Sequence, residues 1–192
     1  MPIPKKTSPY RRHVAKWESC VACPLCTNRS KTVFTRGSVP CDVLFIGEAP
    51  GPSEDVIGKP FIGPAGKFLD ELIFDATYIN TLKQTATKIA FTNLVACLPE
   101  SVEDKIQPPN EVAIKKCYPR LKEFVTICNP SIVILTGKLA SDFFPRKQFP
   151  NISFFEILHP ASILGLDTSC RGLAIKRTVD MIKKAFDSLC PF

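Results

Sequence analysis

A short apolar segment that ends in a turn constrains the fold most strongly. Residues 43–46 (Val-Leu-Phe-Ile) form a continuous apolar run, the pattern of a strand buried on both faces. Residues 47–51 (Gly-Glu-Ala-Pro-Gly) then force a sharp turn. In open α/β sheets, ligands bind just beyond the carboxyl ends of such strands. Two acids that follow this strand, Glu48 and Glu54, are therefore the first candidates for a functional site.

Further apolar runs of similar character alternate with helical patterns along the chain. We expect strands at residues 89–97, 131–137 and 152–158. We expect helices at residues 67–76, 110–128, 138–144 and 175–189, the second of them interrupted or kinked by Pro119. Because strands and helices alternate, the sequence predicts a three-layer α/β/α fold with a mainly parallel, four-stranded sheet.

Length and charge narrow the class of protein. A chain of 192 residues suits one domain, so we expect residues 1–192 to form it, with residues 1–16 as a loose arm or short helix. No apolar stretch approaches the ~18 residues of a membrane span, and no secretory signal is visible. We therefore expect a cytoplasmic protein without membrane contact. A formal charge of +7 favours a polyanionic partner but does not distinguish DNA from RNA.

The chain contains nine cysteines, which without an export signal favour metal binding over disulfides. Cys20, Cys23 and Cys26 have a C-x2-C-x2-C spacing that both zinc and iron–sulfur sites use. Further ligands must come from later segments, and the candidates are Cys97, after the second strand, and Cys117, in a helix. The remaining cysteines are expected to be thiols packed in or near the core: Cys41, Cys128, Cys170 and Cys190.

Two polar residues lie at the ends of later strands. Asn93 has apolar neighbours in the second predicted strand, where an asparagine is most often a structural hydrogen-bonding residue. His159 follows the fourth strand, and a lone histidine is likewise most often structural or on the surface. Because the carboxyl ends of parallel strands meet at one edge, Glu48, Asn93 and His159 are expected on the same rim.

Together these motifs resemble the family 4 uracil-DNA glycosylases, the iron–sulfur branch of that superfamily. The matching segments are GEAPG at 47–51, Glu54-Asp55, GKPFIG at 58–63, Ala65-Gly66, Thr92-Asn93 with Cys97, and HPASIL at 159–164. The resemblance implies the fold of that superfamily. It also implies a DNA repair hydrolase that flips uracil out of DNA and hydrolyses its N-glycosidic bond, leaving an abasic site.

The resemblance assigns three residues to the uracil base. Asn93 would read the base, because its amide complements uracil O4 and N3–H, whereas cytosine inverts that pattern. Phe61 would stack on the base. His159 would face the departing base and, with a backbone N–H near Ala49, stabilise its negative charge.

The resemblance leaves the attacking water less clearly assigned. Related families use an Asp or Asn in the first motif to orient this water, and the present chain has Ala49 there. We therefore expect Glu48 to position the water or the sugar. Glu54 is expected to brace the motif or its contact with the substrate. For both acids the structural alternative is solvation of the turn.

Contacts with DNA and a cofactor also follow from the resemblance. Ser162, Ile163 and Leu164 are expected to contact DNA, with Ile163 and Leu164 as candidate apolar wedges. The likeness also implies a structural [4Fe–4S] cluster and makes Cys26 a bystander. Its expected ligands are Cys20, Cys23, Cys97 and Cys117.

Two other functions compete with this one. The first is a catalytically inactive protein of the same fold that binds DNA or assists replication, favoured by residues 98–109, a loop longer and more acidic than is usual in the family. The second is a zinc-containing, nucleotide-binding α/β protein. A kinase or ATPase is disfavoured because Phe68 stands where a P-loop requires Ser or Thr. We expect a monomer that binds uracil-containing DNA, with a replication or repair protein as a further partner.

Overall fold

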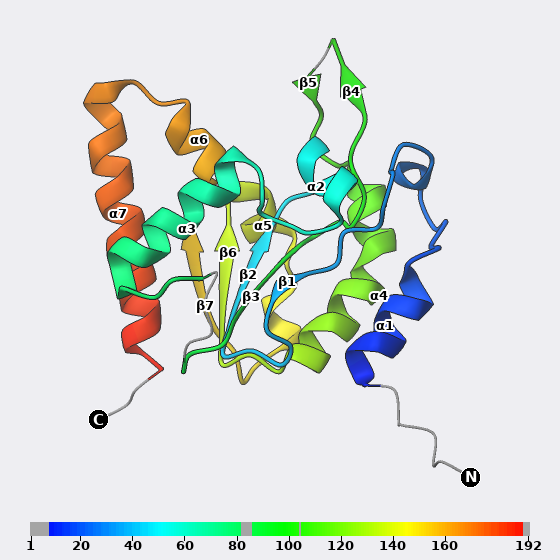
Figure 1. The fold of residues 1–192 in the computed structure, drawn as a ribbon, viewed down its shortest axis with the longest axis horizontal. Coiled ribbons are helices and arrows are strands. Elements are labelled where there is room, and N and C mark those ends of the chain that lie inside the picture. Colours follow the sequence, from blue (N-terminus) through cyan, green and yellow to red (C-terminus); the bar gives the residue numbers. More distant parts are fainter. Residues whose placement is uncertain (1–7, 82–85, 104, 190–192) are drawn as a thin grey trace.

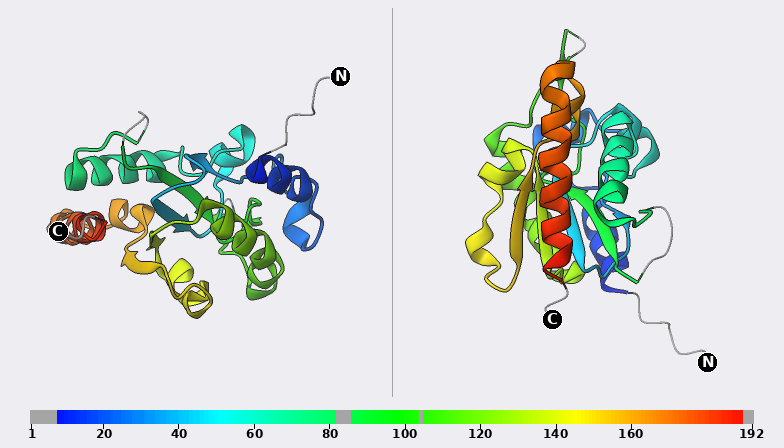
Figure 2. Two further views of the ribbon diagram at one scale, coloured as in Figure 1. Left: turned by 90° about the horizontal axis from the view of Figure 1, so that it is seen from below. Right: turned by 90° about the vertical axis from the view of Figure 1, so that its left-hand side faces the viewer.

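A computed structural model describes residues 8–81, 86–103 and 105–189. In it a five-stranded sheet lies between two layers of helices (Figures 1 and 2). The strand order is β1-β3-β2-β6-β7. The strands are β1 (Arg36–Gly37), β2 (Val43–Gly47), β3 (Ile89–Asn93), β6 (Ile132–Thr136) and β7 (Ser153–Ile157). The predicted α/β/α fold class is confirmed.

The four predicted strands are parallel to one another in the sheet. β2, β3 and β6 are buried along their whole length, as their continuous apolar sequences predicted. A fifth strand, β1, adds an antiparallel edge that places Arg36 opposite Phe91. The sequence does not predict β1, because two residues are too few to show strand periodicity.

The helices divide between the two faces of the sheet according to the direction of the crossovers. The helices are α1 (Pro9–Trp17), α2 (Pro52–Ile57), α3 (Pro64–Thr77), α4 (Glu111–Cys128), α5 (Lys138–Phe143), α6 (Pro160–Leu164) and α7 (Thr168–Asp187), with short 3-10 turns at Pro24–Thr27 and Arg146–Gln148. From β2 the chain passes to β3 on one side and later crosses back to β6 on the other. Right-handed crossovers therefore put α3 and α4 on opposite faces. α6 and α7 pack with α3, and α5 packs on the face of α4 (Figure 2).

The segment before Trp17 is a helix rather than a loose arm. α1 is capped by Ser8, whose Oγ accepts the N–H of Arg11 at 3.2 Å. His13 is fully buried and bonds to Glu123 of α4 through Nδ1 at 3.2 Å. This packing against α4 fixes the helix. Residues 1–7 of the predicted arm lie outside the described residues.

Pro119 does not interrupt α4, which begins after the predicted cap Asn110. The Asn110 Oδ1 atom accepts the N–H of Ala113 at 2.8 Å. Pro119 removes one helical hydrogen bond but lies on the exposed face, where water can satisfy the carbonyl that loses its partner. The opposite, buried face of α4 holds the helix against the sheet.

The segment after β3 differs most from the prediction. The strand ends at Asn93 rather than at Cys97, because the next residues bond to the loop after β2. Leu94 and Val95 donate their N–H groups to the carbonyls of Gly47 and Glu48, at 2.9 and 3.3 Å. The predicted loop 98–109 contains a small hairpin of β4 (Ser101–Val102) and β5 (Lys105–Ile106).

The carboxyl edge of the sheet gathers these irregular segments. In Figure 1 the arrowheads of β2 and β6 point toward α2, α6 and the β4–β5 hairpin. β2 is the strand at which the direction of chain addition reverses, which is where open α/β sheets form ligand sites. Within the described residues, no helix combines the length and apolar character needed to cross a membrane.

Candidate active site

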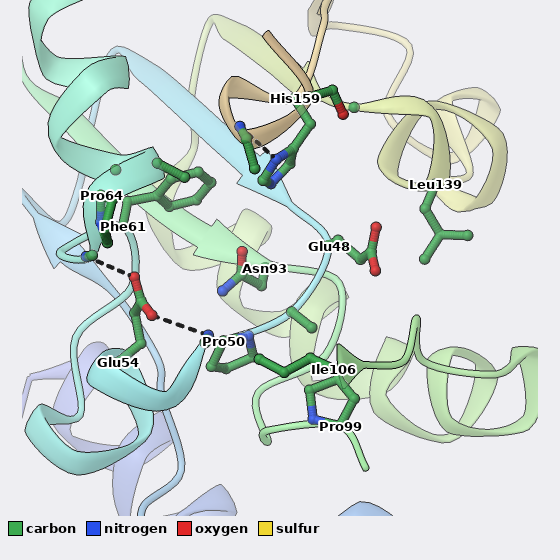
Figure 3. A pocket seen from close by; sticks show the side chains of 18 of the residues that line it. Glu48, Pro50, Glu54, Phe61, Pro64, Asn93, Pro99, Ile106, Leu139 and His159 are labelled. Carbon is green, nitrogen blue, oxygen red and sulfur yellow. Dashed lines mark hydrogen bonds between the residues drawn. The ribbon is translucent and has the colours of Figure 1, made fainter. Parts of the chain in front are cut away.

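A cavity of about 700 Å³ opens at this carboxyl edge (Figure 3). Its walls come from the loops that follow β2, β3, β6 and β7 and from the start of α3. Seven of the predicted site residues line it: Glu48, Ala49, Glu54, Phe61, Asn93, His159 and Ser162. The expectation that separate strand ends meet on one rim therefore agrees with the structure.

Gly47 allows the base-reading candidates to come close together. A Cβ atom at this position would lie 2.5 Å from Cζ of Phe61 and 2.6 Å from Oδ1 of Asn93. Only glycine leaves room for both side chains at the end of β2. Asn93 is the last residue of β3 and is buried, and its amide faces the cavity between Phe61 and Glu48 in Figure 3.

Phe61 forms a rigid aromatic wall of the cavity. Its φ of 55° lies in the left-handed region that few residues with a side chain adopt. Its ring packs 5.7 Å from that of Phe91, centroid to centroid, and Arg36 covers Phe91 at 4.0 Å. A double hydrogen bond to Asp70, at 2.9 and 2.8 Å, fixes Arg36 in turn. A planar ligand would therefore meet a ring that is already held in place.

Glu54 is a structural brace of the first motif. Its carboxylate accepts three backbone N–H groups, from Gly51 at 3.0 Å, Ile62 at 3.1 Å and Gly63 at 2.9 Å. These bonds tie the turn after β2 to the start of α3. The bracing role predicted for this residue agrees with the geometry. Because its oxygens are occupied by the backbone, Glu54 is poorly placed to activate a water.

Glu48 lies only six positions before Glu54 in the chain, but its environment differs from that of Glu54. Among the residues that the structure describes, its carboxylate has no hydrogen-bond or ion-pair partner. The side chain is partly buried at the cavity wall, and this burial raises the pKa of its carboxyl group. An unoccupied carboxylate of raised pKa can orient a water and accept its proton.

One ring nitrogen of His159 bonds to the backbone at the start of α6. Its Nδ1 accepts the N–H of Ala161 at 3.2 Å, so the neutral imidazole carries its proton on Nε2. Burial lowers the pKa of the ring, which keeps it neutral near pH 7. His159 therefore offers an N–H donor to the cavity without carrying a charge.

The predicted contact segment after His159 divides into exposed and buried parts. Ser162 lines the cavity and Leu164 is 38% exposed. Ile163 is 0% exposed and packs in the core with residues of α3 and α7. The prediction that Ile163 is a wedge is therefore wrong, because the turn of α6 directs this side chain inward. Leu164 stays the candidate wedge.

The cavity is also lined by residues to which the sequence assigned no role, some of them within the quoted motifs. They are Pro50, Gly51, Pro52, Ser53, Gly63, Pro64, Ala65, Gly66, Pro99, Ile106, Gly137, Lys138, Leu139, Asp142 and Ala161. Lys138 and Leu139 lie just after the end of β6. Because ligand sites form beyond the carboxyl ends of parallel strands, the argument that found Asn93 could have found them too. Ile106 belongs to the β4–β5 hairpin, which no pattern in the sequence predicted.

The four predicted cluster ligands lie around a second, small cavity. Cys20, Cys23, Cys97 and Cys117 line it, and Cys26 does not. Burial raises the pKa of the thiols of Cys23 and Cys97. Within the described ranges, no three His, Cys, Asp or Glu side chains are close enough to hold a metal ion. Four thiols around one cavity are a donor set that both zinc and iron–sulfur clusters use.

The other cysteines only partly follow the prediction. Cys41 and Cys128 are buried thiols, as expected. Cys170 is exposed at the start of α7, so the expectation that it packs in the core is wrong. Cys190 lies outside the described residues.

The fold and the lined cavity define an α/β protein with a ligand site at the carboxyl edge of its sheet. A family model described as the uracil DNA glycosylase superfamily matches residues 34–188. The chain belongs to this superfamily. This membership sets aside the zinc-containing nucleotide-binding protein as an alternative.

Three relatives are named Type-4 uracil-DNA glycosylases. The chain is 35% identical to that of Saccharolobus solfataricus over 129 residues, which is 67% of this chain and 56% of the relative. Identity to the protein of Sulfurisphaera tokodaii is 33% over 135 residues (70% and 57%). Identity to the protein of Thermotoga maritima is 32% over 127 residues, which is 66% of this chain and 61% of the relative. The matches thus span little more than half the length of these relatives.

One solved structure supports the fold. It is a solution NMR structure from Methanosarcina acetivorans of a candidate uracil DNA glycosylase, with a TM-score of 0.50 and 12% sequence identity. The match covers 81% of this chain and 97% of that one. At this identity the likeness concerns the arrangement of strands and helices alone.

Proposed function

We propose that this protein is a uracil-DNA glycosylase that acts as a monomer on uracil-containing DNA. The observation that carries the proposal is the convergence of the Asn93 amide, the Phe61 ring and the His159 imidazole on one cavity. The named relatives support it. The reaction replaces the bond between the sugar C1′ and uracil N1 with a bond from C1′ to a water oxygen.

Asn93 and Phe61 would select the base. The amide Nδ2 donates to uracil O4, and Oδ1 accepts from N3–H. Cytosine presents a donor at position 4 and an acceptor at N3, so a fixed amide rejects it. Backbone contacts around Gly47 and Leu94 hold this edge of the sheet, and the aromatic wall orients the ring of the base.

His159 would stabilise the departing base. When the glycosidic bond breaks, the electron pair stays with uracil and its O2 becomes strongly negative. A neutral imidazole with Nε2–H can donate to this oxygen, helped by the backbone N–H of Ala49 at the cavity wall. Removal of one such donor typically costs roughly 10²–10³ in rate. Uracil then takes up a proton from solvent.

Glu48 would position the attacking water or the sugar. Its carboxylate is unoccupied by other described side chains and lies on the same cavity wall as Ala49. A negative charge there stabilises the oxocarbenium character of the sugar and accepts the proton that the water loses. Glu54 keeps the motif in shape and does not take part in the proton transfer.

The nucleotide must leave the helical stack before it reaches this site, which costs a few kcal/mol. Leu164, exposed next to the cavity segment of α6, is suited to fill the space left in the duplex. Ser162 lines the cavity and can bond to a phosphate or sugar. The +7 formal charge of the chain favours binding to DNA in general.

A [4Fe–4S] cluster bound by Cys20, Cys23, Cys97 and Cys117 is the cofactor that we propose. Support comes from the shared cavity of these four cysteines and from the names of the relatives. When bound, the cluster would join the N-terminal segment to α4 and to the segment after β3. Hydrolysis of a glycosidic bond requires no electron transfer, so the contribution of the cluster would be structural.

A strand-cleavage assay tests the proposed activity. The protein is incubated with a single strand that contains one deoxyuridine, and alkali then cuts the strand at any abasic site. We expect cutting at the deoxyuridine by the unmodified protein and its loss in Asn93→Ala and His159→Ala. Tight binding without cutting would support the inactive DNA-binding alternative, which the acidic β4–β5 hairpin beside the cavity favours.

A further inference from the structure

Arg120 of α4 is a buried cation without a matching acid. Its side chain is 2% exposed, the largest of the fully buried side chains. No carboxylate forms an ion pair with it in the described part of the chain. Burial of an uncompensated guanidinium is strongly unfavourable, so its charge requires either hydrogen bonds or an anion nearby.

One side of Arg120 bonds to the strand end that carries Asn93. Its Nη2 donates to the carbonyl oxygens of Asn93 at 2.6 Å and of Leu94 at 3.1 Å. Its Nη1 donates to Oγ1 of Thr92 at 3.3 Å. One guanidinium thus holds three consecutive residues at the carboxyl end of β3, where the rigid fork of arginine sets their relative positions.

Arg120 also lines the small cavity around Cys20, Cys23, Cys97 and Cys117, here called the cysteine cavity. Two more cations line it, Arg29 and Lys116, and Nη1 of Arg29 donates to Sγ of Cys97 at 3.3 Å. The same Nη1 donates to the carbonyl of Cys20 at 2.6 Å. The lining thus combines four thiols with three cations. Such a cavity suits an anionic group, and iron bound to four thiolates carries a net negative charge.

We propose that Arg120 is a positioning residue that links the cysteine cavity to the base-reading residue Asn93. On its cavity side it balances the charge of the thiolate-bound cluster. On its strand side it fixes the backbone of Asn93 and so the direction of the amide. The inference rests on the proposed function, since it assigns Asn93 to uracil and the cavity to a cluster.

The test compares Arg120→Lys, Arg120→Met and the matched control Arg177→Lys, at an exposed arginine of α7, in the full chain. Lysine keeps the charge but loses the fork, so Arg120→Lys should retain iron and visible absorbance while KM for a uracil-containing strand rises about tenfold with a smaller change in kcat. Methionine removes the charge, so Arg120→Met should also lose iron. Arg177 lines neither cavity, so Arg177→Lys should leave KM and iron content unchanged.

A second readout keeps the inference separate from the activity. The side-chain amide of Asn93 gives an NMR signal that can be assigned by its loss in Asn93→Asp. We expect this signal to shift in Arg120→Lys and not in Arg177→Lys, whether or not the protein releases uracil. A protein that releases no uracil would overturn the proposed function alone.

Two results would overturn the link itself. One is a fully iron-loaded Arg120→Lys variant with the unmodified KM and an unshifted Asn93 amide signal. The other is Arg120→Met with unmodified iron content, which would remove the charge-balancing role. A merely structural arginine would lower the fraction of folded protein, and hence apparent kcat, and leave KM unchanged.

Discussion

The cavity of about 700 Å³, here called the base cavity, and the cysteine cavity are both lined by one segment, residues 93–97, but are built differently. Asn93 lines the first and Cys97 the second. In the base cavity the polar groups are oriented by the chain itself: Glu54 by three N–H groups and His159 by the N–H of Ala161. In the cysteine cavity, Arg29 and Arg120 face thiols and carbonyls rather than acids.

In the base cavity the fold alone orients the polar groups. In the cysteine cavity a bound anionic group must balance the charge of the cations. The base cavity is preorganised, so single substitutions there should change the reaction rate more than the stability. The cysteine cavity combines cations with ligands for an anionic metal group, so substitutions there should change stability and colour together. Each prediction below tests one side of this contrast.

The largest effect is expected for Asn93→Asp. The carboxylate keeps an acceptor for N3–H but loses the donor to O4 and places a charge beside it, so uracil excision should fall by about 10³-fold or more. Single-turnover excision rates measure this change. Asn110→Asp is the matched control, because aspartate caps α4 as well as asparagine does. Excision within tenfold of the unmodified rate would remove Asn93 from base reading.

On the other side of the contrast, Cys97→Ala should abolish the visible brown absorbance and lower the melting temperature in the same variant. The physical reason is that metal binding and folding are coupled when ligands come from separate segments. Absorbance spectra and thermal unfolding measure the two changes. Cys26→Ala, outside the cavity, should change neither. Unchanged colour in Cys97→Ala would contradict the ligand set.

An intermediate effect is expected for Glu48, through the pH dependence of excision. Burial raises its pKa above the ordinary value of 4.5, and the reaction needs the carboxylate, so the rate should fall as pH decreases through the raised pKa. Glu48→Gln should lower the rate and remove this acidic limb. A pH profile of single-turnover rates measures both. If the rate of Glu48→Gln still falls at low pH as in the unmodified protein, another group causes this pH dependence.

The same shift has a consequence for stability. A carboxyl group whose pKa is raised on folding stabilises the protein below its unfolded pKa, and this contribution is lost as pH rises through the folded pKa. At pH 7 the charged Glu48 is therefore unfavourable for folding, and Glu48→Gln should raise the denaturation midpoint. At pH 4 the two proteins should differ less. A lower midpoint for Glu48→Gln at pH 7 would contradict the burial argument.

The smallest effect is expected at the rim. Leu164→Ala should lower excision from duplex DNA by about tenfold or less and leave single strands unaffected, because only the duplex requires a wedge. Leu173→Ala, an exposed leucine on α7, is the matched control. The ratio of duplex to single-strand rates measures the effect. An equal loss on both substrates would remove the wedge role of Leu164.

Much of the architecture could be predicted because burial leaves a direct pattern in the sequence. The strands β2, β3, β6 and β7 and the helices α3 and α7 follow from apolar periodicity. The site followed from the strand-end rule and the family resemblance together. Asn93 and His159 each had a structural interpretation that the sequence did not exclude, and only the fold shows that both line one cavity.

The failures have two physical causes, which are contacts between distant segments and elements too short to show a pattern. Ile163 and Leu164 are adjacent and equally apolar, and only the packing of α6 distinguishes the buried one from the exposed one. The β4–β5 hairpin is too short for periodicity. Arg120 did leave a pattern: it falls on the helical face of Ala113, Leu121 and Phe124, where a charged residue is unexpected.

The most direct test is the mass of one oligonucleotide after incubation with the unmodified protein. The strand carries a single deoxyuridine among several deoxycytidines, and free base is detected in the same sample. We predict one abasic site at the deoxyuridine, an equal amount of released uracil and no released cytosine. An unchanged oligonucleotide recovered from a stable complex, or release of cytosine at a comparable rate, would contradict the account.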